Sequence, residues 1–270
     1  MNWRAIWAII GKDLRLVRQS KSVMIPLVTI PLLVTVVLPL VVGIVIRVTH
    51  LAEHADIRKI LAVLPADLAQ QMAGLTPTQA ILSYLLVYFF APLYLILPIM
   101  VSNVIAADSF AGERERKTLE ALLYTPTSDE ELLTAKLLAA WLPGLLVGLV
   151  SFVLYVVVVN TVAWPVMQQL LLPNAMWFFL VFWVGPAAAG LGLGASVLVS
   201  ARTNSLQSAY QIGSLIVVPL MGLIIGQLSG ALYLSLSVVF LMGLGLWLID
   251  AGLFWFGQRT FRRSVLIARL

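Results

Sequence analysis

The sequence predicts an all-α integral membrane protein with six transmembrane helices, and three observations support this fold class. Of its 270 residues, 61% are hydrophobic and only 11% are charged, whereas a soluble domain carries about 25% charged residues. The apolar residues form long runs of the length that a membrane span requires. The charged residues collect between these runs and near the chain ends. The sequence contains no cysteine, which excludes disulfides, thiolate metal sites and cysteine nucleophiles.

Residues 1–21 predict an amphipathic helix that lies in the headgroup region of the bilayer. The segment holds five bases and one acid, Asp13, and its apolar residues recur at steps of three and four. Basic flanks and tryptophans favour such an interfacial position. The residues assigned to this helix are Trp3, Arg4, Trp7, Lys12 and Arg15. A cleaved signal peptide is excluded because the next apolar run is too long for a signal core and no small-x-small cleavage site follows it.

Six apolar runs predict the six spans, and together with the first helix they form one domain over residues 1–270. The runs lie at about 22–46, 81–107, 137–159, 176–200, 210–226 and 231–256. Three prolines in the first run predict kinks: Pro26, Pro31 and Pro39. Thr76 and Gln79 form a capping-box pattern with Pro77 at the first helical position, which predicts the start of the second span.

Two glycine pairs predict close packing between spans. Gly190 and Gly194 lie in the fourth run, and Gly222 and Gly226 lie in the fifth. Both pairs have the small-xxx-small spacing that lets helix backbones approach each other. Because these glycines sit inside predicted spans, they indicate packing surfaces rather than a nucleotide-binding loop.

The distribution of basic residues predicts the orientation of the chain in the membrane. If the N-terminus lies inside, the inner segments hold 14 of the 17 Lys and Arg, and the outer ones hold only Arg47, Arg58 and Lys59. The positive-inside rule therefore places both termini and the segment 108–136 in the cytoplasm. The net charge of +5 thus reports topology, and we expect no nucleic-acid partner.

The segment 108–136 is the most charged part of the chain, with seven acids and four bases. Charged pairs four residues apart and a narrow leucine stripe predict a short helix within it. Pro126 ends this helix, and Thr127 with Glu130 forms a capping-box pattern that predicts the start of the next one. Spacing alone leaves two interpretations open: a contact surface for a partner, or a solvated connection between the second and third spans.

The same segment resembles the cytoplasmic loop of ABC-2 type permeases, which forms a coupling helix against an ATPase subunit. The residues of the predicted coupling helix are Gly112, Glu113, Arg114, Glu115, Arg116, Lys117, Thr118, Leu119, Glu120, Leu122, Leu123 and Pro126. Lys117 stands where many members of that family have glycine. The basic tail around Arg262 and Arg263 is also similar to the C-terminal end of these permeases.

The resemblance implies the transmembrane subunit of an ATP-driven ABC transporter in the inner (plasma) membrane, and export is the expected direction. It also implies three partners: an ABC ATPase subunit, a second copy of the permease or a homologous permease, and the lipid bilayer. ATP and Mg²⁺ are expected on the ATPase. Within this chain, the nearest match to a phosphate-binding loop ends at Lys117-Thr118 but has Ala111 and Arg116 at its two glycine positions. We therefore expect neither catalysis nor a cofactor in this chain.

Two other function classes remain: a secondary transporter or channel, and a membrane assembly subunit that does not transport. An ion-driven transporter usually buries ionisable residues in its spans, and the predicted spans contain one, Asp250. We expect Asp250 to pair with a basic neighbour such as Arg202 or to be wetted from the cytoplasm. His50 and His54 flank Glu53 on the predicted outer segment, where solvated residues are expected rather than a metal site.

Overall fold

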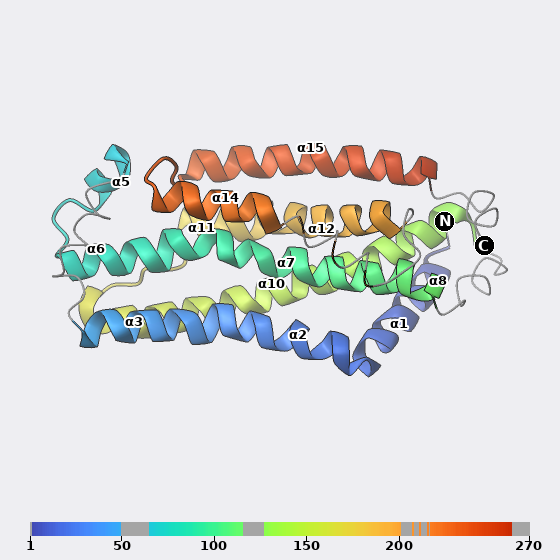
Figure 1. Ribbon diagram of the computed structural model, residues 1–270, viewed down its shortest axis with the longest axis horizontal. Coiled ribbons are helices and arrows are strands. Elements are labelled where there is room, and N and C mark those ends of the chain that lie inside the picture. Colours follow the sequence, from blue (N-terminus) through green and yellow to red (C-terminus); the bar gives the residue numbers. More distant parts are fainter. Residues whose placement is uncertain are drawn as a thin grey trace.

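The computed structural model describes residues 2–49, 65–115, 127–200 and 217–260, together with positions 207, 211 and 215. Every regular element in these residues is a helix, and the long helices run side by side along one direction (Figure 1). The predicted all-α fold class is therefore confirmed. His50, His54 and Arg202 lie outside the described residues.

Five helices in the described part of the chain are long and apolar enough to cross a membrane. They cover Val23–Val48, Pro77–Gly112, Asp129–Met167, Ala175–Val199 and Leu236–Trp255. The fifth predicted span appears only as α14 (Val217–Leu228), which has 12 residues. A helix of that length measures about 18 Å, and the hydrocarbon core is about 30 Å thick. The structure thus shows a multi-pass membrane protein without confirming six spans.

The first part of the chain folds into a short tilted helix and a long one. These elements are α1 (Trp3–Gln19), α2 (Lys21–Leu32), the π-helical segment η1 (Leu33–Val37) and α3 (Leu38–Val48). The Asn2 side chain accepts hydrogen bonds from the first backbone N–H groups of α1, and Ser20 ends that helix in an extended conformation. Figure 1 shows α1 turning away from the line of α2 and α3.

The second long helix is built from α-helical and π-helical pieces. Its elements are α6 (Pro77–Ser83), η3 (Tyr84–Phe89), α7 (Phe90–Ala107), η4 (Asp108–Gly112) and α8 (Glu113–Glu115), and α5 (Ala66–Gln71) precedes it. The predicted capping box is confirmed, because the Thr76 and Gln79 side chains each bond the other's backbone N–H. The helix extends beyond the predicted range 81–107 at both ends.

The third long helix, α10 (Asp129–Met167), has 39 residues and starts with a capping box. The prediction placed this box at Thr127 and Glu130, which is wrong by one residue. Ser128 is the cap, and its hydroxyl accepts from the Glu131 N–H at 3.2 Å. Both pairs fit the same sequence pattern, so only the backbone register separates them. At about 58 Å, α10 exceeds the hydrocarbon core.

The last part of the chain adds α11 (Ala175–Phe179), η5 (Leu180–Val184), α12 (Gly185–Ser200), α14 and α15 (Leu236–Thr260). Helix α12 packs against α7, α10 and α15 and thus lies at the centre of the described bundle. Figure 1 shows α15 along one side of the bundle, with α10 and α3 on the other.

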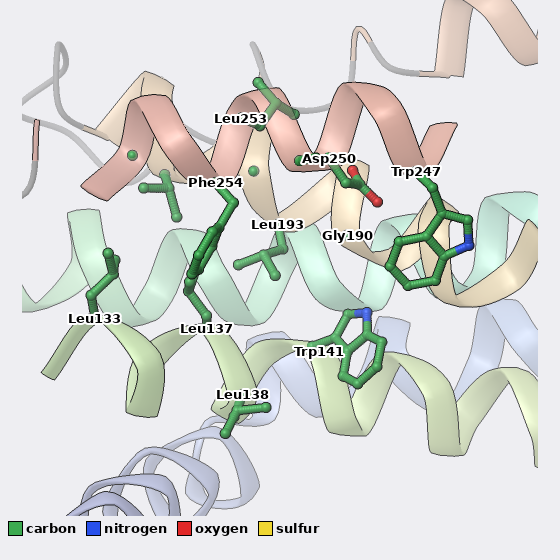
Figure 2. A pocket seen from close by; sticks show the side chains of 14 residues that line it. Leu133, Leu137, Leu138, Trp141, Gly190, Leu193, Trp247, Asp250, Leu253 and Phe254 are labelled. Atoms are coloured by element: carbon green, nitrogen blue, oxygen red, sulfur yellow. The ribbon is translucent and has the colours of Figure 1, made fainter. Parts of the chain in front are cut away.

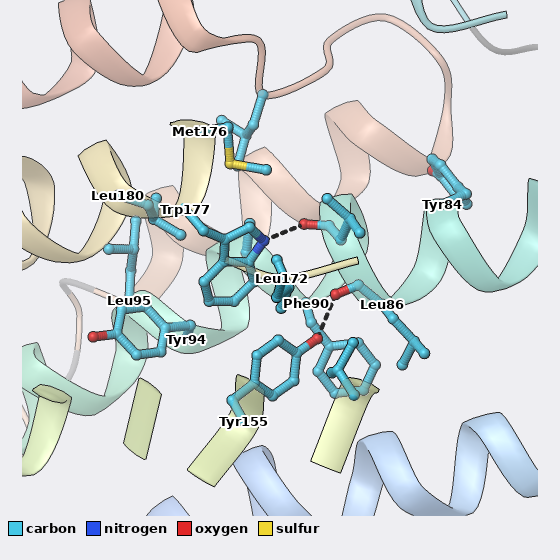
Figure 3. Close-up of a cluster of buried hydrophobic side chains, with 14 of the residues drawn as sticks. Tyr84, Leu86, Phe90, Tyr94, Leu95, Tyr155, Leu172, Met176, Trp177 and Leu180 are labelled. Carbon is cyan, nitrogen blue, oxygen red and sulfur yellow. Dashed lines mark hydrogen bonds between the residues drawn. The ribbon is translucent and has the colours of Figure 1, made fainter. Parts of the chain in front are cut away.

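The π-helical segment η3 is stabilised by side chains from three other helices. A π-helix shifts the backbone register and leaves carbonyl groups that need other donors. The Leu86 carbonyl accepts from the Tyr155 hydroxyl at 2.5 Å, and the Val87 carbonyl accepts from Trp177 Nε1 at 2.8 Å. Gln227 of α14 donates to the Tyr88 carbonyl. Figure 3 shows the first two bonds, with the rings of Tyr155 and Trp177 stacked 4.8 Å apart.

Candidate functional site: a buried ionic cluster

Three elements that are far apart in the sequence meet at one end of the bundle. They are α1, the η4–α8 segment and the first turns of α10 (Figure 1). Their apolar side chains form a shared core, in which Ile6 and Ile10 of α1 pack with Phe110 and Leu132. This core brings charged residues of all three elements together.

Lys136 of α10 is the centre of the charged group and is fully buried. Its Nζ donates to Glu113 Oε2 at 2.5 Å and to the Ser109 carbonyl oxygen at 2.5 Å. The same Nζ lies 3.9 Å from Asp13 Oδ2. An ammonium group without water requires such partners, because burying an unpaired charge is costly.

Two residues of α1 complete the group. Lys12 Nζ donates to Glu113 Oε1 and lies 3.1 Å from Asp13 Oδ1. The Ser109 hydroxyl donates to Asp13 Oδ2 at 3.0 Å. We refer to Lys12, Asp13, Ser109, Glu113 and Lys136 as the ionic cluster. Its two cations and two carboxylates alternate, so each charge lies beside opposite charges.

The electrostatics of the ionic cluster favour the charged forms. Burial acts to raise the pKa of Glu113, but the Lys136 charge and the hydrogen bonds from Lys12 and Lys136 lower it below its ordinary value. Burial acts to lower the pKa of Lys12, but its bond to Glu113 and the Asp13 charge raise it above its ordinary value. Both residues are therefore ionised at neutral pH.

A second polar contact joins α1 to the start of α10. The backbone N–H of Asn2 donates to Glu131 Oε1 at 2.5 Å. Glu131 also accepts from the Ser128 N–H as part of the capping box. One carboxylate therefore connects the first turns of both helices, outside the buried ionic cluster.

The opposite face of α1 points outward. Trp3 is 55% exposed and Trp7 is 59% exposed, and Arg4 and Arg15 are also exposed. Lys12 is only partly exposed, because it lies at the boundary between this face and the ionic cluster. The exposed aromatic and basic side chains are of the kinds that favour a headgroup region, and the interfacial position of α1 stays a prediction.

The structure describes only the beginning of the predicted coupling helix. Gly112, Glu113, Arg114 and Glu115 belong to η4 and α8, whereas the predicted residues in the range 116–126 lie outside the described residues. Those residues are Arg116, Lys117, Thr118, Leu119, Glu120, Leu122, Leu123 and Pro126. Glu113 is 2% exposed and faces the ionic cluster. Glu115 is exposed.

Sequence reasoning missed Asp13 and Ser109 as members of the site and gave Lys136 no specific role. The signal for Asp13 was its place as the one acid in a basic segment, directly after Lys12. The signal for Lys136 was a base next to a long apolar run, where an unpaired charge would be costly. Neither signal identifies the partner, because the partners are more than 20 residues apart in the sequence.

The predicted packing glycines have different surroundings. A Cβ on Gly190 would overlap the Asp250 carboxylate, and one on Gly194 would lie 2.8 Å from Leu253 Cδ1. These two positions therefore require glycine for the approach of α12 to α15. A Cβ on Gly226 would make ordinary contact with Leu232, and one on Gly222 would meet no described atom within 4 Å.

Asp250 of α15 has apolar surroundings among the described residues, and its predicted pairing or wetting stays a prediction. Both carboxylate oxygens are buried, and neither has a hydrogen-bond partner among the described residues. We expected a basic partner or contact with water, and the proposed partner Arg202 lies outside the described residues. Figure 2 shows Asp250 beside Gly190 and Trp247 at an apolar pocket.

Comparison with known protein families gives a match over most of the chain. The model of the family described as ABC-2 family transporter protein matches residues 7–249. No curated protein matches the chain. The family match begins within α1, includes the whole charged segment and extends almost to Asp250 in α15, so it covers well over half of the chain. The chain therefore belongs to the ABC-2 family of transporter proteins.

Proposed function

We propose that the chain is the transmembrane permease subunit of an ATP-driven exporter, coupled through residues 112–126 to a separate ATPase subunit that binds ATP and Mg²⁺. Family membership supports a role in membrane transport. In this proposal the chain acts together with a second permease copy or a homologous permease. Both termini and the ionic cluster lie on the cytoplasmic side, as the distribution of Lys and Arg favours.

The observation that carries this proposal is the ionic cluster at the start of the coupling segment. Glu113 lies directly after η4 and binds Lys12 of α1 and Lys136 of α10. Removing one partner of a buried ion pair costs about 3–5 kcal/mol. A displacement of the segment that follows Glu113 is therefore transmitted to α1 and α10 instead of being absorbed in a loose connection.

We assign two different roles to residues of the coupling segment. Glu113 is buried and anchors the segment. The charged and leucine residues that follow supply the contact with the ATPase in our proposal. Reversing the charge of Glu113 would therefore place a third cation beside Lys12 and Lys136 and would test folding rather than association.

A secondary transporter is the second candidate, and the buried carboxylate of Asp250 is the observation that favours it. Ionisable residues within spans often mark ion pathways. A single carboxylate without a described partner gives no relay, however. Asp250→Asn should therefore leave the pH dependence of ATP-driven transport unchanged. Loss of activity together with a changed pH profile would support ion coupling instead.

Copurification with the cognate ATPase tests the proposed function. In the double variant Leu119→Ala/Leu122→Ala, association should weaken by tenfold or more, because apolar contacts carry most of the affinity at a small interface. Glu120→Lys should weaken association in a salt-dependent way. Leu170→Ala is the matched control, because Leu170 is an exposed leucine (66%) just after α10 ends, at the other end of that helix from the ionic cluster.

Permease-stimulated ATP hydrolysis should fall in parallel with association in the two coupling-segment variants and not in the control. Equal binding and equal stimulation in all variants would show that the segment is only a solvated connection. A permease that never copurifies with an ATPase would favour the third function class, an assembly subunit that does not transport.

A further inference from the structure

The feature that the proposed coupling role leaves unexplained is a pocket of about 400 Å³ between α10, α12 and α15. Figure 2 shows side chains of α10 on one side and of α15 on the other, with Leu193 of α12 between them. The described lining is apolar except for one carboxylate. The residues that matter for its chemistry are Leu137, Trp141, Trp247, Asp250 and Phe254.

Among the described side chains that line this pocket, Asp250 is the only charged one. Both of its oxygens are buried and without a hydrogen-bond partner among the described residues. Gly190 lies against the carboxylate, so at this position no side chain lies between the Asp250 carboxylate and the backbone of α12. A carboxylate in such surroundings favours a cation that supplies both charge and apolar contact, because burial of an unpaired charge is costly.

Two tryptophans flank the pocket with their polar atoms turned to other partners. Trp141 Nε1 donates to the Pro186 carbonyl at 3.0 Å, and Trp247 Nε1 donates to the Trp183 carbonyl at 3.2 Å. These bonds fix the rings and use their N–H groups. The rings therefore offer apolar and π surfaces, which attract organic cations.

We propose that this pocket binds a lipophilic organic cation, with a protonated amine at Asp250 and an apolar body between Trp141, Trp247 and Phe254. Metal ions fit poorly, because they need several oxygen or nitrogen ligands and the described lining offers one carboxylate. A neutral lipid chain would fill the space and leave the carboxylate unpaired. The inference concerns binding to this chain alone and does not depend on the ATPase.

The test measures binding of a radiolabelled probe, N,N-dimethyl-4-phenylbutylamine, to the full-length chain in nanodiscs, with empty nanodiscs subtracted. Parent chain should bind the amine saturably. The neutral isostere (5-methylhexyl)benzene, in which CH replaces the protonated nitrogen, should compete at least tenfold less well. Asp250→Asn should weaken amine binding at least tenfold, since it removes the charge and keeps the shape. Asp67→Asn, at an exposed aspartate of α5, is the matched control and should bind like the parent.

A second variant keeps the test decisive if Asp250→Asn folds poorly. Leu137→Trp places a bulky ring among the apolar side chains that would hold the body of the amine and should weaken amine binding at least tenfold. Equal binding by the parent and Asp250→Asn, or equal competition by the neutral isostere, would show an unselective apolar site and overturn the proposal. Retained amine binding in Leu137→Trp would show that the amine binds elsewhere, which would overturn it as well.

Discussion

Lys136→Met removes the central cation of the ionic cluster, and its effect follows from the distances. Lys136 Nζ lies 2.5 Å from Glu113 and 3.9 Å from Asp13. At an effective dielectric constant of about 20, these contacts correspond to attractions of about 7 and 4 kcal/mol. The variant also avoids the cost of burying the ammonium, which is several kcal/mol. Of these two partners only Asp13 belongs to α1, and without Lys136 the carboxylates of Asp13 and Glu113 share Lys12 as their one cation. We therefore expect the docking of α1 to weaken by about 3–5 kcal/mol, the usual cost of removing one partner of a buried pair.

The assay uses the absence of native cysteine. Ile10 of α1 is 1% exposed, so a cysteine at this position reacts with a water-soluble thiol reagent only when α1 separates from the bundle. Lys136→Met should increase the labelling rate by about a hundredfold to a few thousandfold, since 1.4 kcal/mol corresponds to a factor of ten. Arg15→Met is the matched control, because Arg15 lies on the exposed face of α1.

A double variant separates the ion pair from general destabilisation. Lys136→Met combined with Glu113→Gln removes both charges of the buried Lys136–Glu113 pair and leaves Lys12 beside Asp13. The increase in its labelling rate should be smaller than the product of the increases in the two single variants. The difference corresponds to a coupling energy of about 0.5–3 kcal/mol between the two side chains. A labelling rate in Lys136→Met equal to that of the Arg15→Met control would refute the electrostatic account of α1 docking.

Three further predictions follow from the same structure. Cysteines at Gln168 and Ser128 should differ in labelling by an impermeant reagent in intact cells, with only Gln168 reacting from outside; labelling of Ser128 would overturn the orientation. Trp177→Phe leaves the Val87 carbonyl of η3 without its donor and should lower the free energy of unfolding by about 1–3 kcal/mol. Trp164→Phe, at an exposed tryptophan, should have little effect. Equal thermal stability of the two variants would contradict a stabilising role for the Trp177–Val87 hydrogen bond. The ionised Glu113 side chain stabilises the docking of α1 fully above its unfolded pKa of 4.5, and this stabilisation is lost as the pH falls through the lowered pKa of the folded protein. Docking of α1 should therefore be constant from about pH 5 to neutral pH and weaken below pH 4.5. Docking that strengthens on acidification would contradict the lowered pKa of Glu113.

The sequence predicted those features that local patterns encode. Long apolar runs located the membrane helices, and the capping box at Thr76 was read correctly. The box at α10 was misplaced by one residue because Thr127 and Ser128 both have a glutamate three positions later. The predicted runs end short of the helix ends at Gly112 and Asp129, because both helices continue through polar and charged residues that hydropathy does not mark.

Features that depend on tertiary contacts were not predictable in this way. The ionic cluster joins Asp13 to Ser109, 96 residues apart, and Glu113 to Lys136, 23 residues apart. Sequence spacing predicted a pairing of Glu113 with Lys117, four positions on, and Lys117 lies outside the described residues. The π-helical segment η3 carries no clear local signal, because its stability comes from donors on α10, α11 and α14.

In our proposal the ionic cluster transmits motion from residues 112–126 to α1, and one measurement tests this transmission most directly. The thiol reactivity of Ile10→Cys is followed in the permease–ATPase complex before and after ATP is added. The account predicts a nucleotide-dependent change in reactivity that disappears in Glu113→Gln while the ATPase remains bound. A nucleotide-dependent change of the same size in Glu113→Gln would contradict the claim.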